Sequence, residues 1–352
     1  MAYRDYSFYQ KLFRRWRRKY GGAIRSRAYE GTRGYLKSST DDTSNTGAKN
    51  NSGIWHLEAI HAAKANFVPA GEHVFNTAGT YSFTVPDGVT SVSILCVGGG
   101  EGGGSRYGGD GGCLSYINNV TVTSGETLSV TVGAGGGGNI GTGSLAGTDG
   151  GASQVTRSGN AIAHAYGGPS HGSTVTGSTV FNGGDGGYGY ANSTPYGIVY
   201  NGGGGGGAGG YSGNGGNGDS NGGSGSAGTG GGAGGGGSRT GYSQNTTTAY
   251  AFGRDGRGGG GVGLYGEGAS GTGGSSTGGG GGGSGGSTGS GRVGGAYGGG
   301  GGGGYTRNGS NTSQLSGGAA AQGAVRIIWG EGREFPSTNV DEASSDSNVS
   351  TN

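Results

Sequence analysis

Blocks of nearly continuous glycine are the feature that most constrains what this chain can fold into. Glycine fills 102 of 352 positions, about four times its ordinary share. The blocks begin only after a stretch with strand character, and the chain ends its glycine body on another such stretch, AVRIIW at 324–329. They lie at 98–104, 133–138, 202–207, 230–237, 258–261, 278–283 and 298–304. Because only 29% of the residues are apolar, a large core of side chains is excluded.

Three states are open to the glycine body, residues 133–323. Gly/Ser-rich sequence usually forms a flexible linker, and loop-closure entropy rises too slowly with length to forbid one of this size. Collagen needs abundant proline and glycine at every third position, so a chain with five prolines excludes it. The third state is a bundle of polyglycine type II helices, which are extended threefold helices that hydrogen-bond to their neighbours because no Cβ separates them.

The sequence before the glycine body predicts β-strands. Five stretches alternate apolar and small polar residues at period two, and Pro86-Asp87-Gly88 is typical of a turn between two of them. The stretches are 73–75, 81–85, 91–97, 114–123 and 128–132. Strands with one polar face each favour an antiparallel β-sandwich or jelly-roll-like frame.

Residues 1–37 predict a basic amphipathic docking segment that begins with a helix. Aromatic and aliphatic residues between Tyr9 and Tyr20 fall on one helical stripe, and half of the 22 lysines and arginines lie between Arg4 and Lys37. Such a helix suits an acidic protein groove, a nucleic acid or an anionic membrane. We expect it to dock onto a partner protein. The residues expected to make this contact are Leu12, Phe13, Arg14, Arg15, Trp16, Arg17 and Arg18.

The remaining segments complete the expected organisation. Residues 38–53 form a polar linker, 54–71 a short helix and connector, 72–330 the glycine-rich β/polyglycine domain, and 331–352 a disordered acidic tail. In the short helix, His56, Glu58 and His61 are spaced differently from the zinc-binding His-Glu-x-x-His pattern. We therefore predict a surface histidine pair there, with no metal site and no cofactor.

Several functional classes lack their sequence signals. Cys96 and Cys113 do not make a disulfide framework, which leaves either two buried thiols or one bridge. No apolar run reaches the roughly 18 residues of a membrane span, and the N-terminus has no apolar region typical of a secretory signal peptide. Phosphate-binding and hydrolase motifs are missing, and Gly-x-Gly-x-x-Gly carries no weight where glycine is everywhere. The sequence therefore predicts a protein that is not an enzyme.

Three inserts interrupt the glycine body with tyrosine, asparagine, serine and threonine. They span 185–201, 238–255 and 305–316. Tyrosine with serine, glycine and asparagine is the composition of adaptable binding loops, although these rings would also serve to pack on glycine and close the ends of a bundle. The candidate receptor-binding residues are Tyr188, Tyr190, Tyr196, Tyr200, Tyr242, Tyr250, Phe252 and Tyr305.

The order of these features resembles the glycine-rich domain of bacteriophage tail-fibre and adhesin-type virion proteins. The resemblance rests on YSFTVPDG at 81–88, on 92–97 running into Gly98-Gly-Gly, on 128–133, and on GAVRIIW at 323–329. A similar arrangement occurs in the extracellular glycine-rich domain of anaplastic lymphoma kinase. The resemblance implies a mainly β fold, in which a sandwich or jelly-roll-like frame encloses polyglycine type II helices. The short α-helical N-terminal region expected from the residue spacing precedes this domain and is outside the resemblance. It also implies that loops between the glycine helices contact a host receptor.

We accordingly expect a phage virion structural protein, a tail-fibre or tail-tip component at the particle exterior. Its N-terminus would attach to other virion proteins, and its tyrosine-rich loops would bind a host-surface glycan or outer-membrane protein without membrane insertion. A homotrimer and a monomeric tip are both compatible. One alternative is a passive capsid or tail decoration protein. Another is a glycine-rich RNA-binding protein, which the single dense Arg-Gly stretch at 254–259 supports weakly, because few phosphates would be neutralised.

Overall fold

A computed structural model of the chain describes residues 70–139, 147–189, 191–194, 197–220, 222–238, 243–245, 250–252, 254–275, 277–283, 285–306 and 314–337. The chain divides into two compact units, residues 1–67 and 68–352, and all described residues belong to the second. The expected basic helix with Leu12–Arg18, the polar linker and the short helix after it lie outside the described residues.

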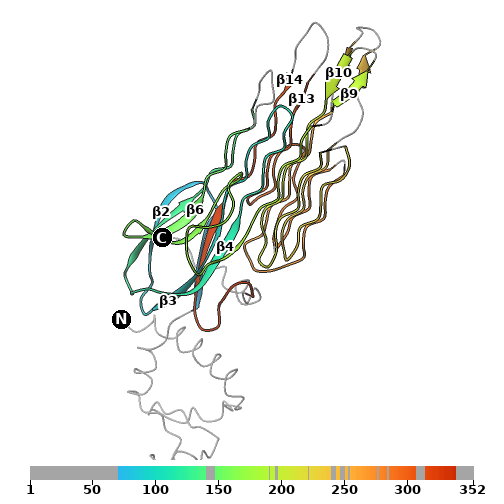
Figure 1. Cartoon of the computed structure of the whole chain (residues 1–352). Coiled ribbons are helices and arrows are strands. Elements are labelled where there is room, and N and C mark those ends of the chain that lie inside the picture. The colour runs from blue at the N-terminus through green and yellow to red at the C-terminus, as the bar shows by residue number, and fades with distance from the viewer. Residues whose placement is uncertain are drawn as a thin grey trace, which may run out of the picture. The chain divides into compact units, whose positions relative to one another are not determined.

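Two antiparallel sheets lie at one end of this unit (Figure 1). The five-stranded sheet has the order β1 (Gly71–Phe75), β15 (Ala324–Trp329), β3 (Ser91–Val97), β4 (Leu114–Thr121) and β8 (Thr179–Phe181). The four-stranded sheet has the order β2 (Gly79–Thr84), β5 (Thr127–Val132), β6 (Ser153–Arg157) and β7 (Asn160–Ala165). The prediction of a mainly β, antiparallel fold is confirmed for the described residues, which contain no helix.

One hydrophobic core joins the two sheets. Alternate residues of strands from both sheets line it, as the period of two requires. Its members include Phe83, Ile94, Cys96, Leu128, Val130, Val155, Val325 and Ile327. Both cysteines are buried free thiols.

Strands β3 and β15 are buried on both faces, which corrects the expectation of one polar face per strand. Leu95 and Val97 of β3 and Ile328 of β15 point away from the first core and form a second one. Its other side consists of residues from the glycine region, among them Ala208, Tyr211, Ala233, Val262 and Leu264. Because the glycine region covers this face, the central strands need apolar residues on both sides.

Three strands of the two sheets lie inside residues 133–323, the predicted glycine body. β6 and β7 form a hairpin through Ser158-Gly159, and β8 pairs with β4 as the edge strand of its sheet. The inward positions of β7 are the alanines Ala163 and Ala165. Alanine has low β-propensity, so the alternation was hard to recognise.

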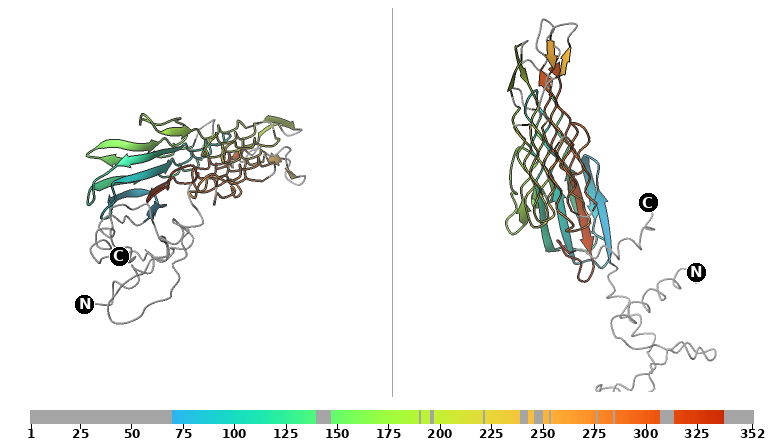
Figure 2. Two further views of the ribbon diagram at one scale, coloured as in Figure 1. Left: turned by 90° about the horizontal axis from the view of Figure 1, so that it is seen from below. Right: turned by 90° about the vertical axis from the view of Figure 1, so that its right-hand side faces the viewer.

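The glycine segments continue the strands of the sheets. β3 continues into 98–104, β5 into 133–139 and β8 into 182–189, while 107–113 leads into β4 and 317–323 leads into β15. Figures 1 and 2 show these extended segments running side by side from the sheets toward the opposite end of the unit. Each segment is therefore fixed at one end by a strand.

Hydrogen bonding in the glycine segments repeats every three residues. In segment 201–210, Gly203, Gly206 and Gly209 donate their N–H groups to segment 106–112 at 2.9–3.0 Å. The residues one place before them donate to segment 254–260, and the residues one place after them donate to segment 213–219. Successive residues thus face three different neighbours.

The carbonyl groups of the same segment serve three further neighbours. Gly206 accepts from Gly300, Gly207 accepts from Gly184, and Gly205 accepts from Gly236, each at 2.7–2.9 Å. Segment 201–210 is therefore bonded on all sides through its main chain, to parallel and antiparallel neighbours alike.

Main chains approach so closely that a side chain has no room between them. A Cβ built on Gly206 would lie 1.9 Å from the carbonyl oxygen of Gly184. On Gly108 it would lie 1.9 Å from the carbonyl oxygen of Gly204. Real Cβ atoms do not come this near, so glycine is required at these positions by contact rather than by dihedral angle.

Short hairpins occur at the end of the glycine segments remote from the sheets. They are β9 (Ala191–Thr194) with β10 (Gly197–Tyr200), β11 (Ser243–Asn245) with β12 (Tyr250–Phe252), and β13 (Tyr305–Thr306) with β14 (Gln314–Leu315). Figure 1 labels β9, β10, β13 and β14 there, and β10 lies beside β13. These hairpins coincide with the three tyrosine-containing inserts.

Candidate functional site on the glycine segments

Side chains project from the outer glycine segments at every third residue. Segment 107–113 reads Tyr-Gly-Gly-Asp-Gly-Gly-Cys, and segment 182–188 reads Asn-Gly-Gly-Asp-Gly-Gly-Tyr. The two run antiparallel, because Gly111 N–H donates to Gly184 O at 2.9 Å and Gly108 N–H donates to Gly187 O at 2.8 Å. This register sets the side chains of the two segments opposite one another in three ranks.

The three ranks have different chemistry. Tyr107 lies opposite Tyr188, with ring centroids 4.7 Å apart. Asp110 lies opposite Asp185, and their ligand atoms are within 4.8 Å of each other. Cys113 lies opposite Asn182, with its Sγ 3.8 Å from Oδ1. We call these the tyrosine, aspartate and cysteine ranks.

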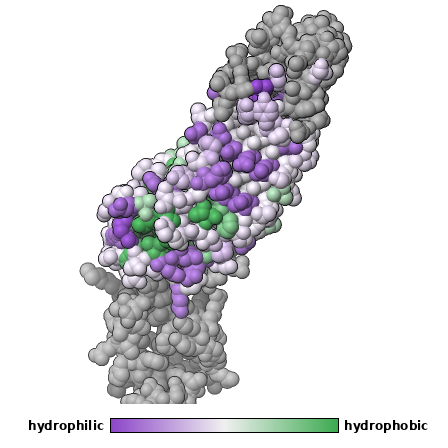
Figure 3. All heavy atoms as spheres, in the orientation of Figure 1, coloured by the Kyte–Doolittle hydropathy of each residue, from purple (hydrophilic) through white to green (hydrophobic). Residues whose placement is uncertain are grey.

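A third segment, 214–220, extends this face. The N–H groups of Asn182, Asp185 and Tyr188 donate to side-chain oxygens of Asn214, Asn217 and Ser220, at 3.0, 3.0 and 2.9 Å. The period of three residues thus places polar groups side by side on neighbouring segments. In Figure 3 the visible face is hydrophilic to neutral along the glycine segments, and its hydrophobic residues gather over the sheets.

The tyrosine rank forms an aromatic cluster with Arg106. The Cζ atom of Arg106 lies 4.4 Å from the ring centroid of Tyr200 and 5.6 Å from that of Tyr188. Both distances are within the range of cation–π attraction. The Tyr188 side chain remains 45% exposed, so this cluster offers an accessible ring beside a guanidinium group. We call Arg106, Tyr107, Tyr188 and Tyr200 the tyrosine–arginine cluster.

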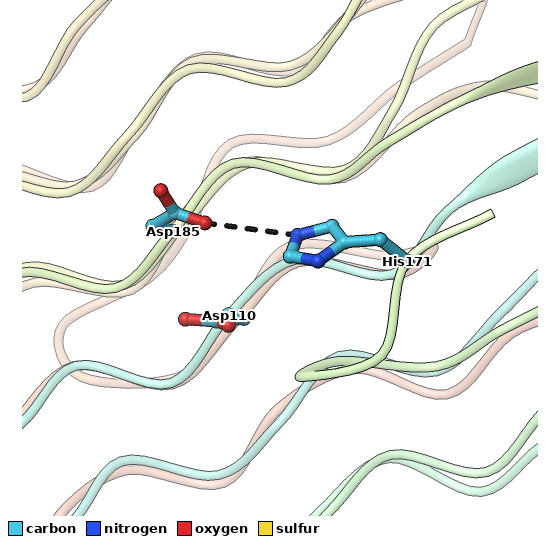
Figure 4. Close-up of side chains that lie close together, drawn as sticks. All are labelled: Asp110, His171 and Asp185. Carbon is cyan, nitrogen blue, oxygen red and sulfur yellow. Dashed lines mark ion pairs between the residues drawn. The ribbon is translucent and has the colours of Figure 1, made fainter.

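The aspartate rank has a histidine beside it (Figure 4). His171, from the loop between β7 and β8, places its Nε2 atom 3.6 Å from Oδ1 of Asp185. Asp110 Oδ1 accepts the N–H of Gly186 at 2.7 Å. Burial and the neighbouring Asp185 charge raise the pKa of Asp110, against the lowering effect of the Gly186 hydrogen bond and of His171.

A further carboxyl group is buried among the glycine segments. Glu101 is 8% exposed, and its Oε2 accepts the N–H of Asp110 at 3.0 Å. Burial raises the pKa of Glu101 to about 7, and the charges of Asp110 and Asp149 add to this rise.

The structure brings only some of the predicted receptor-binding residues together. Tyr188 and Tyr200 share the cluster, and Tyr305 is half-buried on β13, beside β10. Tyr250 and Phe252 belong to strand β12, and the structure describes only their backbone. Tyr190, Tyr196 and Tyr242 lie outside the described residues. Whether any of the eight binds a receptor stays a prediction.

Sequence reasoning missed Arg106 and Tyr107, which lie in the same cluster, and the group of Asp110, His171 and Asp185. A signal for part of this was present. The two X-Gly-Gly-X-Gly-Gly-X stretches at 107–113 and 182–188 mark threefold segments with one outward position per turn. No sequence signal aligned them or placed His171.

Comparison with known proteins gives one finding. Among the curated proteins none matches this chain. Within the described residues no helix is long and apolar enough to cross a membrane. A family model described as a glycine-rich domain matches residues 76–330, which is most of the chain and contains both sheets from β2 onward and all the glycine segments. The chain therefore belongs to this glycine-rich domain family.

Proposed function

We propose that this chain is a bacteriophage virion structural protein of the tail fibre or tail tip. Its N-terminal segment would attach to the particle, and its glycine-rich domain would bind the host surface. Two observations support the second part. The hairpins of the three inserts gather at the end remote from the sheets, and the tyrosine–arginine cluster lies where β10 returns toward segment 201–210.

We also propose that the glycine segments are polyglycine type II helices that continue from a sandwich-like frame at one end. A threefold helix with no internal hydrogen bonds presents successive residues to three different sides. The main-chain bonds of segment 201–210 repeat in this way, and they connect it with six surrounding segments. The close approaches at Gly108 and Gly206 favour the same arrangement.

The single observation that carries the binding proposal is the composition and exposure of the tyrosine–arginine cluster. Tyrosine rings offer large, rigid contact area at low entropic cost, and the exposed face of Tyr188 can stack on the apolar face of a sugar ring. Arg106 supplies N–H donors for hydroxyl or acidic groups beside that ring. A surface glycan of the host cell fits this combination best.

The test is binding of the labelled full chain to intact bacterial cells and to a glycan array. We expect Tyr188→Ala to weaken binding about tenfold, as truncation of a tyrosine hot spot does. Tyr265→Ala is the matched control, because Tyr265 is similarly exposed at 41% but packs against Arg326 of β15. If Tyr188→Ala bound as well as the unchanged chain, the passive decoration protein would become the better proposal.

The RNA-binding alternative finds less support. Its only dense Arg-Gly stretch, 254–259, takes part in the main-chain bonding of the bundle, with Arg254 O and Arg257 O accepting from Gly202 and Gly205 at 2.7 Å each. A segment ordered in this way is not free to wrap a nucleic acid strand.

A further inference from the structure

The aspartate rank and His171 converge from three separate parts of the chain. Asp110 precedes β4, Asp185 follows β8, and His171 belongs to the loop that connects β7 with β8. Their ligand atoms all lie within 4.8 Å of one another, and Figure 4 shows the imidazole edge directed toward Asp185. We propose that Asp110, His171 and Asp185 bind one divalent transition-metal ion, with Zn²⁺ as the representative case.

The main chain itself forces the two carboxylates together. The bonds from Gly111 to Gly184 and from Gly108 to Gly187 fix the register of their segments, so neither aspartate can move along its segment to avoid the other. Two carboxylates side by side repel each other unless a positive charge lies between them. The register therefore creates a site of concentrated negative charge that a cation would relieve.

No lysine or arginine of the described residues relieves it. The sequence contains no lysine after Lys64. Among the described residues, no arginine forms an ion pair with Asp110 or Asp185, and the one ion pair at these two aspartates joins His171 to Asp185. Arg106, the nearest basic residue along segment 106–113, instead lies over the rings of Tyr188 and Tyr200.

The donor set selects the class of ion. Ca²⁺ and Mg²⁺ prefer oxygen ligands alone, whereas an imidazole nitrogen with carboxylate oxygens suits Zn²⁺ and similar transition metals. Ligands of a tetrahedral zinc ion lie about 3.4 Å from one another, given bond lengths of about 2.1 Å. Atoms within 4.8 Å of one another need to close by at most about 1.4 Å, which rotation of the exposed Asp185 and His171 side chains supplies. Three protein ligands leave a fourth position for water or a bound group.

The bound ion would join the β7–β8 loop to two glycine segments. This loop also bonds the cysteine rank, because Gly172 N–H donates to Asn182 Oδ1 at 3.1 Å. The ion would thus hold the loop at two successive ranks. The proposal does not depend on the receptor-binding role of the tyrosine rank.

The test is calorimetric titration of the metal-free full chain with Zn²⁺. We expect one ion per chain, and at least about tenfold weaker binding in Asp110→Asn and in His171→Ala. His171 is exposed, so its replacement leaves the fold intact, and Asn at 110 can still accept the Gly186 N–H. In hydrogen exchange, Zn²⁺ should slow the amides of residues 170–173 in the unchanged chain and leave them unaffected in His171→Ala.

Two control variants separate this site from others. Asp87→Asn removes a remote carboxylate on the β2–β3 turn, and His56→Ala/His61→Ala removes the histidine pair near the N-terminus; both should bind Zn²⁺ as the unchanged chain does. The proposal is overturned if His56→Ala/His61→Ala abolishes binding while Asp110→Asn and His171→Ala retain it. The absence of any saturable Zn²⁺ binding would overturn it as well.

Discussion

In the two sheets, side chains such as Ile94, Leu128 and Ile327 fill the space between the layers. Their burial stabilises the fold by about 25 cal/mol for each Å² of apolar surface removed from water. In the glycine segments, main chains touch directly, through hydrogen bonds of 2.7–3.1 Å around segment 201–210. One unit therefore contains two kinds of interior, one filled by side chains and one filled by backbone.

The interior filled by backbone depends on the interior filled by side chains. Ordering glycine costs more conformational entropy than ordering any other residue, about 1–2 kcal/mol each for the backbone, while each hydrogen bond returns only about 1 kcal/mol net. Isolated glycine segments would therefore not assemble. Here the strands β3, β4, β5, β8 and β15 fix one end of a glycine segment each, and a hydrophobic core at Val97 and Ala208 joins both interiors.

The strongest test of this comparison is amide hydrogen exchange at neutral pH. If the glycine interior is as ordered as the sheets, the described amides within 202–304 should exchange at least about a thousandfold more slowly than a free peptide, as bonded core amides do. Amides of β3 and β15 provide the reference within the same sample. Exchange of 202–304 at free-peptide rates beside protected sheets would mean that the glycine body is a linker, and the polyglycine proposal would be lost.

The sheets were predictable to the extent that their side chains alternate. The expected strands 73–75, 81–85, 91–97, 114–123, 128–132 and 324–329 correspond to β1–β5 and β15, with ends shifted by up to two residues. β7 was missed because alanine serves as its inward residue. The second buried face of β3 was missed because sequence patterns do not reveal that glycine main chain can cover a sheet.

The candidate site was predictable only in its individual segments. The triplets around Asp110 and Asp185 indicate outward positions, but the antiparallel register that pairs them is set by main-chain bonds between residues about 75 positions apart. Glycine leaves no side-chain pattern from which that register follows. For the same reason, no sequence pattern indicates that Arg106 and Tyr200 lie in contact.

Two adjacent glycines, Gly136 and Gly137, test whether the glycine interior is closely packed. A Cβ on Gly136 would lie 1.9 Å from Thr148 O, whereas a Cβ on Gly137 would meet only the Thr148 hydroxyl, at 3.6 Å. We expect Gly136→Ala to lower the free energy of unfolding by more than about 3 kcal/mol, beyond the ordinary cost of overpacking. Gly137→Ala should change the free energy of unfolding by less than about 1 kcal/mol. The change is an increase where the lower backbone entropy of alanine in the unfolded chain outweighs the new contact.

Denaturant unfolding of the two variants measures the difference. Far-UV circular dichroism follows the sheets, and limited proteolysis follows the glycine segments, so loss of one interior without the other would be visible. Equal stability of Gly136→Ala and Gly137→Ala would contradict a close-packed backbone interior, because only contact distinguishes these adjacent positions.

The smallest expected effect concerns Glu101, the one carboxyl group of the 98–104 glycine block. Its pKa of about 7 in the fold exceeds the ordinary glutamate value of about 4.3 in an unfolded chain, so the fold binds the proton more tightly than the unfolded chain does. Stability should therefore fall as pH rises from about 4.5 to about 7 and stay low above that range. Glu101→Gln keeps an oxygen for the Asp110 N–H and removes the charge. We expect it to match the unchanged chain at pH 4 and to exceed its stability at pH 8 by about 1 kcal/mol, less than the full shift implies because solvent still reaches part of the carboxyl group.

Glu126 provides a control of opposite sign from the sheet region. The N–H of Thr123 and the guanidinium of Arg157 lower the pKa of Glu126, and Arg157 Nε lies 2.6 Å from its Oε1. Its charged form therefore stabilises the fold at neutral pH, and that contribution is lost as pH falls through its lowered pKa. Glu126→Gln should accordingly be less stable than the unchanged chain at pH 8 and equal to it in acid. Thermal unfolding of both variants from about pH 2 to pH 8 measures the two trends, because the contribution of Glu126 is lost only below its ordinary pKa. If Glu101→Gln followed the trend of Glu126→Gln, Glu101 would be a solvated, stabilising carboxylate. The glycine segments around it would then lack the dry, backbone-filled interior that distinguishes them from the sheets.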